Sequence, residues 1–76
     1  MFGTEFKSIR KGLGLTVLQW ARALGYAGSV KTVREQIAKY DRNVRPIPPW
    51  IARLAMMYQR FGVPDDFTDN RGAGKD

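Results

Sequence analysis

The sequence predicts an all-α protein, a compact bundle of four or five helices. Apolar residues recur along the chain at a spacing near 3.6, and strand-like alternation of apolar and polar residues is absent. At 76 residues, the chain has room for a single domain. A hydrophobic fraction of 43% is enough for a packed core, and with no cysteine in the chain, helix packing must stabilise it.

The first predicted helix spans residues 5–13 and begins after Thr4, whose hydroxyl suits the N-cap position. One apolar face at helical spacing is formed by Phe6, Ile9 and Leu13. Glycine weakens a helix and favours its end, so we expect this helix to stop between Gly12 and Gly14.

The second predicted helix begins at Thr16 and is closed by Gly25. Thr16 and Gln19 fit a capping box, in which each side chain accepts a hydrogen bond from the other residue's backbone N–H. The apolar residues of this short helix follow helical spacing: Val17, Trp20, Ala21 and Leu24. Because Trp20 lies on this stripe, we interpret it as a core residue.

The third predicted helix spans about residues 29–42, with Asn43 as a left-handed cap at its end. Its apolar stripe consists of Val30, Val33, Ile37 and Tyr40. Residues 45–49 contain three prolines and cannot be helical, because proline lacks a backbone donor and constrains the residue before it.

The fourth predicted helix spans about residues 49–61, since proline suits the opening turn of a helix. Its apolar stripe is wider than one core face requires, because Trp50, Met56 and Met57 extend it. We expect the domain to comprise residues 1–64 and residues 65–76 to form a flexible tail.

The charge balance points to a polyanionic partner. The formal net charge is +6, and residues 1–64 hold 11 of the 13 basic residues and only 3 of the 7 acidic ones. A compact body this basic favours nucleic acid first and an anionic membrane surface second.

Several function classes are excluded by composition. The chain has no histidine and no cysteine, and its three carboxylates before residue 65 have no metal-ligand spacing, so we expect neither catalytic residues nor a metal site. No glycine-rich nucleotide loop, cofactor site or small-molecule site is evident. No apolar run is long enough to span a membrane and no signal peptide is recognisable, so a cytoplasmic protein is expected.

Two helices joined by a glycine-containing turn suggest a helix-turn-helix, whose second helix enters the DNA major groove. Ala21 fits the helix crossing and Gly25 the turn. Residues 15–26 (LTVLQWARALGY), with residues 37–48 (IAKYDRNVRPIP) after them, resemble the Cro/C1-type helix-turn-helix family of bacterial and phage repressors. The resemblance covers roughly residues 6–61 and implies a small DNA-binding regulator.

Two departures separate this chain from that family's pattern. Ile37 follows Gly25 by twelve residues, whereas about six is typical of the family, so the turn, the recognition helix or both are extended. Val17 stands where the family often has a phosphate-contacting glutamine, so that contact is not expected here.

The third helix presents side chains suited to reading base edges. With Val33 and Ile37 buried, the exposed or flanking residues at about 100° per residue are Lys31, Thr32, Arg34, Glu35, Gln36 and Lys39. We expect phosphate contacts from Thr16, Arg42 and Arg45. The competing interpretation is an ordinary solvated face with ion pairs among Lys31, Glu35 and Lys39.

The sequence therefore predicts a sequence-specific double-stranded DNA-binding transcriptional regulator, a repressor acting by promoter occupancy as a homodimer. It would be bacterial or phage-encoded, cytoplasmic and associated with the nucleoid. The predicted dimer interface lies on the fourth helix at Trp50, Met56, Met57 and Phe61.

Three alternatives remain. A protein-interaction module, antitoxin-like or adaptor, would use the Trp50–Phe61 face and would not need the basic residues of the third helix. A peripheral membrane peptide would need strongly amphipathic helices without a shared core. Stacking of single-stranded nucleic acid on exposed aromatic residues such as Trp50 is the third.

Overall fold

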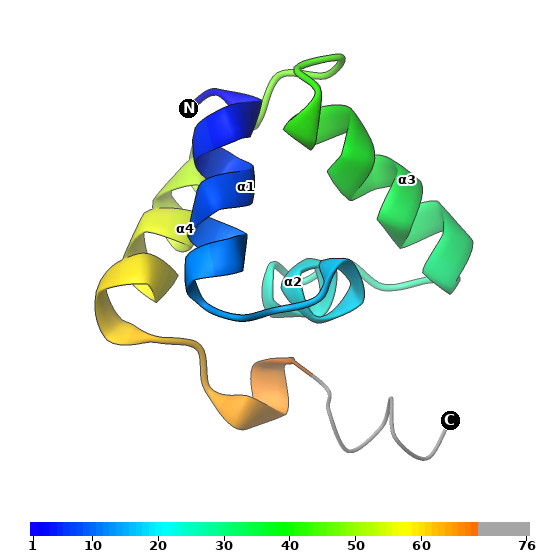
Figure 1. Ribbon diagram of the computed structural model, residues 1–76. Helices are drawn as coiled ribbons and strands as arrows, with labels where there is room; N and C mark the ends of the chain where they lie inside the picture. Colours follow the sequence, from blue (N-terminus) through cyan, green and yellow to red (C-terminus); the bar gives the residue numbers. More distant parts are fainter. Residues whose placement is uncertain (69–76) are drawn as a thin grey trace.

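The computed structural model describes residues 1–68, which form four α-helices and one short 3-10 helix (Figure 1). The elements are α1 (Gly3–Gly12), α2 (Val17–Ala23), α3 (Val30–Asp41), α4 (Pro49–Phe61) and η1 (Asp65–Phe67). α1 packs on both α3 and α4, while α2 packs on α3 and η1. No strand occurs in the described residues, which confirms the all-α prediction. None of the helices in this part of the chain has the length and apolar character needed to cross a bilayer.

One aromatic ring from each helix meets in the core. Phe6 of α1 contacts Trp20 of α2 at a centroid distance of 5.3 Å and Tyr40 of α3 at 5.8 Å. Trp20 in turn meets the ring of Tyr58 in α4 at 6.3 Å. All four side chains are buried. Edge-on and tilted ring pairs add about 0.5–1.5 kcal/mol each beyond the area they bury, so this chain of rings fastens the four helices together.

Three helices end in the same hydrogen-bonding pattern, a Schellman motif. Each has a residue with positive φ just beyond the cap: Gly14 (72°), Gly25 (92°) and Asn43 (59°). After α2, for example, the Gly25 N–H donates to the Arg22 carbonyl and the Tyr26 N–H to the Ala21 carbonyl. The helix ends predicted at these positions are confirmed.

The start of α1 is held by the end of α3. The Gly3 N–H donates to Oδ1 of Asn43 at 2.7 Å, so a side chain forty residues away satisfies one of the free donors of this helix. The predicted N-cap at Thr4 is wrong: the N-cap position is Phe2, and Thr4 is exposed in the first turn. Gly3 is buried because the backbone of α3 passes directly beside it.

The predicted bounds of α4 are confirmed, with Pro49 in its first turn. Tyr58 fixes this helix to α2, because its hydroxyl donates to the Ala23 carbonyl at 2.6 Å. Ordered structure continues beyond residue 64, where the sequence placed the domain boundary. The Phe67 ring lies 6.4 Å from that of Tyr58, and Thr68 is buried. Residues 69–76 of the predicted tail lie outside the described residues.

Gly3→Ala should destabilise the protein by about 1–3 kcal/mol or more, because a Cβ at this position would collide with the backbone carbonyls of Tyr40 and Asp41, which cannot move aside as a side chain would. Gly12→Ala is the matched control in the same helix. No atom lies within 4 Å of a Cβ built there, so that variant should be stabilised by about 0.5–1 kcal/mol. Urea unfolding of both variants tests this, and equal stability would contradict the close approach.

Candidate nucleic-acid interface

The turn between α2 and α3 is six residues long, from Leu24 to Ser29. Arg22 holds it through two hydrogen bonds, from Nη1 to the Tyr26 carbonyl (3.2 Å) and from Nη2 to the Gly28 carbonyl (3.3 Å). A helix-turn-helix usually has a turn of about three or four residues. The connection between α2 and α3 is two or three residues longer than that.

The residues predicted to join these two helices have the burial and backbone conformation that this role requires. Ala21, Val33 and Ile37 are buried, and Gly25 has a positive φ at the turn. α3 starts at a defined N-cap, since Oγ of Ser29 accepts a hydrogen bond from the Thr32 N–H at 3.2 Å. The Ser29 hydroxyl also donates to Oγ1 of Thr32 at 2.8 Å. The position of α3 is thus fixed both by its buried face and by its first turn.

The α3 outer face comprises the side chains that point away from the bundle: Lys31, Thr32, Arg34, Glu35, Lys39 and Arg42. Lys39 is half-buried and the other five are exposed. No ion pair is present within residues 1–68, so Lys31, Glu35 and Lys39 do not form the pairs that an ordinary solvated helix would favour. The cations on this face are available to an external anion.

Gln36 lies at the edge of this face and is occupied by a tyrosine network. Its Nε2 donates to the Tyr40 hydroxyl at 2.9 Å, and its Oε1 accepts from Nη1 of Arg45 at 2.7 Å. The hydroxyls of Tyr40 and Tyr26 share a hydrogen bond of 2.6 Å. Burial, followed by this bond to Tyr40, raises the pKa of Tyr26 to about 12. Two residues predicted for different roles, base reading for Gln36 and phosphate binding for Arg45, are therefore bound to each other.

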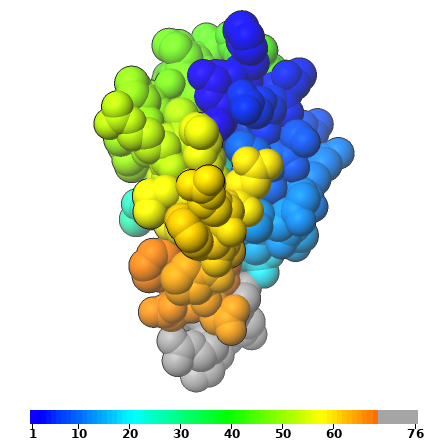
Figure 2. Space-filling model, turned by 90° about the vertical axis from the view of Figure 1, so that its left-hand side faces the viewer, coloured from blue at the N-terminus to red at the C-terminus, as the bar shows by residue number. Residues whose placement is uncertain are grey.

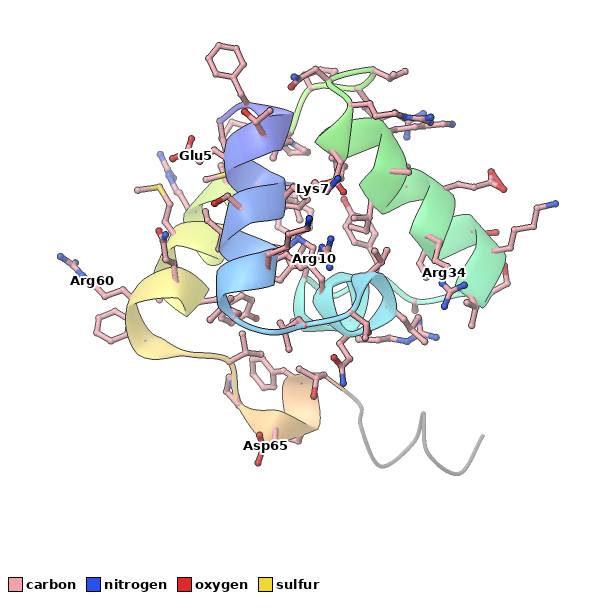
Figure 3. All side chains as sticks on the ribbon, in the orientation of Figure 1. Glu5, Lys7, Arg10, Arg34, Arg60 and Asp65 are labelled. Atoms are coloured by element: carbon pink, nitrogen blue, oxygen red, sulfur yellow. The ribbon has the colours of Figure 1, made fainter. Side chains whose placement is uncertain are left out.

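α1 contributes three cations close to α3, which are Lys7, Arg10 and Lys11. Lys7 and Arg10 extend from α1 on the side that faces α3 (Figure 3). Together with Lys11 they lower the pKa of the Asp41 carboxyl, but burial outweighs them and holds that pKa above its ordinary value of 3.8. Lys7 and Lys11 are four residues apart and therefore lie on one face of a helix. This spacing is the feature of the sequence that could have predicted a cationic face on α1.

Arg34 stands beside this group of charges. It lines a surface hollow of about 340 Å³ with Val17, Ala38 and Asp41, where the start of α2 approaches α3. Asp41 Oδ1 is buried with no hydrogen-bond partner within residues 1–68. A cationic surface thus extends from the α3 outer face across this hollow to α1, with one poorly solvated carboxylate in its middle.

Thr16 is confirmed as the N-cap of α2. Its Oγ1 accepts from the Gln19 N–H at 3.1 Å, and its own N–H donates to Gln19 Oε1 at 3.0 Å. The capping box is therefore complete. Phosphate contact by Thr16 stays a prediction, as it does for the exposed Arg42 at the C-cap of α3.

The residues predicted as a dimer interface lie elsewhere. Trp50, Met56, Met57 and Phe61 are all more than half exposed on α4. This helix and α3 lie on opposite sides of α1 (Figure 1). The structure therefore separates the exposed apolar side chains from the cationic surface.

Comparison of the chain with protein-family models, with curated proteins and with solved structures found no match. The resemblance to Cro/C1-type regulators therefore depends on the sequence motifs at residues 15–26 and 37–48.

Asp41→Asn should raise the free energy of unfolding at neutral pH. The native state binds a proton at Asp41 more tightly than the unfolded chain does, because burial raises the carboxyl pKa. The native state is therefore favoured by this group below pH 3.8, and that advantage is lost as the pH rises through the folded pKa. A negative charge near the C-terminus of α3 is also unfavourable to the helix dipole.

The measurement is urea unfolding at several pH values between 3 and 7, with exposed Glu35→Gln as the control for removal of one carboxylate. The gain from Asp41→Asn should grow with pH. A gain that is absent or that shrinks as the pH rises would show that the cations of α1 outweigh burial.

Proposed function

We propose that the protein is a sequence-specific double-stranded DNA-binding regulator, in which α2 and α3 form a helix-turn-helix and α3 reads the major groove. The observation that carries the proposal is the α3 outer face. Cationic and hydrogen-bonding side chains without internal ion pairs project from a helix whose opposite face is locked onto α1 and α2. Such a helix, backed by a second helix across a six-residue turn, suits insertion into a groove.

The charge distribution supports the same proposal. Arg42 at the end of α3 and Lys7 and Lys11 on α1 lie at the margins of the reading face, where DNA backbone phosphates flank a helix in the groove. Arg45 adds a cation held on Gln36. Thr16 remains a further proposed phosphate contact at the start of α2.

We assign base reading to five side chains of the α3 outer face. Lys31, Arg34 and Lys39 can donate to guanine, Glu35 can accept from cytosine, and the Thr32 methyl can contact thymine. Gln36 can pair with adenine only after leaving both Arg45 and Tyr40. We therefore assign Gln36 to positioning Arg45 rather than to direct reading.

In this proposal the regulator acts by occupancy, as a repressor that blocks a promoter. Two copies bind two half-sites about one DNA turn apart, because one unit this small contacts few base pairs. The proposal includes action in the bacterial cytoplasm, at the nucleoid. A pure interaction module is the alternative, and it would leave the α3 outer face without a role.

Duplex binding should weaken steeply with salt. The logarithm of the binding constant should fall linearly with the logarithm of salt concentration, with a slope of about −0.9 per phosphate contact. Selection from a random duplex library followed by anisotropy titration measures preference and slope, and sedimentation on the selected site gives the stoichiometry. Selected sites with two-fold symmetry bound by two copies are expected. Absence of duplex binding even at low salt would refute the proposal.

Arg34→Ala should cost about 1–3 kcal/mol on the selected site and less on unrelated DNA, as expected for a bidentate guanine contact. Glu35→Ala should tighten binding to unrelated duplex while lowering the ratio of specific to non-specific affinity, because it removes a negative charge near phosphates.

Gln36→Ala and Arg45→Ala should weaken binding to the selected and the unrelated duplex alike and leave the sequence preference intact. If Gln36→Ala instead relaxes the preference at one base pair, Gln36 reads a base.

A further inference from the structure

α4 carries an exposed surface that the proposed DNA contacts do not use. Figure 2 looks directly onto this helix (yellow), from the side of the molecule opposite α3. The exposed side chains of α4 after Pro49, here called the α4 surface, are Trp50, Arg53, Met56, Met57, Gln59, Arg60 and Phe61. All but Trp50 line a shallow hollow of about 710 Å³. Exposed aromatic and methionine side chains gathered around a hollow are typical of a protein-binding surface.

The α4 surface has an apolar row and a cationic row. Trp50, Met57 and Phe61 are seven and four residues apart, which places them on one side of the helix at about 100° per residue. Arg53 and Arg60 are seven residues apart and form a second row next to the first. The Arg60 guanidinium lies over the Phe61 ring at 5.9 Å, so the two rows touch. α4 has no acidic residue.

We propose that the α4 surface docks an acidic amphipathic helix of another protein. The apolar side of that helix would lie on Trp50, Met57 and Phe61, and two carboxylates seven residues apart would lie over Arg53 and Arg60. Methionine and aromatic side chains adapt readily to such a helix. Because the charged residues of the α4 surface are all positive, they favour a partner with negative charge.

A second copy of this chain fits the α4 surface less well. In a two-fold pair of antiparallel helices, each contact occurs twice with the residues exchanged. A pair centred between Met56 and Met57 would therefore set Arg53 against Arg60 at both ends, like charge against like charge. The α4 surface is thus better matched to an acidic partner than to the homodimer interface predicted from the sequence.

An anionic membrane is also a poorer match. Recognition of anionic lipid by a helix usually depends on a cluster of about four to eight Lys or Arg residues. α4 offers two, and its other face is buried against the core through Ile51, Ala55 and Tyr58. Because α3 lies on the far side of the molecule, a helix docked on α4 leaves the α3 outer face open to DNA.

The test uses two labelled synthetic helical peptides and the full-length protein. The acidic probe carries three leucines spaced by seven and four residues and two glutamates seven residues apart, and the control probe has lysine in place of each glutamate. Anisotropy titration should show the acidic probe binding about tenfold more tightly, the effect expected of exposed ion pairs that become repulsive in the control. Arg53→Glu with Arg60→Glu should reverse the preference. Both residues are exposed, and thermal unfolding checks that the double variant folds.

The outcomes below would overturn the proposal or assign the α4 surface to a different occupant. Equal affinity for the two probes, or binding of neither, would overturn the proposal. Self-association in sedimentation that Met57→Lys abolishes, together with exclusion of the probe, would assign the α4 surface to a second copy. Binding to vesicles of phosphatidylserine and phosphatidylcholine without binding of the probe would assign it to a membrane. Saturating duplex should leave probe binding unchanged, and failure to bind DNA would not affect the peptide measurements.

Discussion

The ring contact between Phe6 and Trp20 is the interaction on which the remaining structure depends. It joins α1 to α2, and through Tyr40 and Tyr58 the same two rings reach α3 and α4. The indole Nε1 of Trp20 has no hydrogen-bond partner within residues 1–68, so packing alone sets the place of this ring. A chain without disulfides that forms so small a core must concentrate its buried area, and aromatic side chains do this most efficiently.

This core also determines the chemistry of the surface. Tyr40 has its ring in the aromatic cluster and its hydroxyl in the tyrosine network, so Gln36 and Arg45 are positioned from the interior of the protein. Tyr58 likewise holds α4 in place from the buried side, which leaves the opposite side of that helix free. The α3 outer face and the α4 surface are thus two outward sides of one packing arrangement.

The parts of the fold that the sequence predicted correctly are those with local signals. The capping box of Thr16 and Gln19, the stop at Gly25 and the start at Pro49 each involve residues within one turn of one another. Thr4 was predicted as a cap for the same local reason, and it failed because Asn43 supplies the cap from a distant part of the chain. No periodicity reveals such a contact.

The candidate site shows the same division. Helical spacing placed Lys31, Arg34 and Glu35 correctly on the outside of α3. It could not show that Gln36 and Arg45 bind each other, because that bond depends on how the chain turns back after Asn43. The approach of Lys7 and Lys11 to Asp41 likewise depends on the packing of α1 against α3.

The bond between Gly3 and Asn43 closes the first three helices into a ring, since it joins the beginning of α1 to the end of α3. Closing a loop of forty residues costs more chain entropy than the local pairing of α2 with α3. α4 packs on α1 and is also held to α2 through the Tyr58 hydroxyl, so it does not depend on that closure alone. Opening of the Gly3–Asn43 junction would free the start of α1 and the end of α3, while the ring contacts of Phe6 still hold both helices in the core. Local opening of this kind exposes the backbone amides at those two helix ends before those of the central turns.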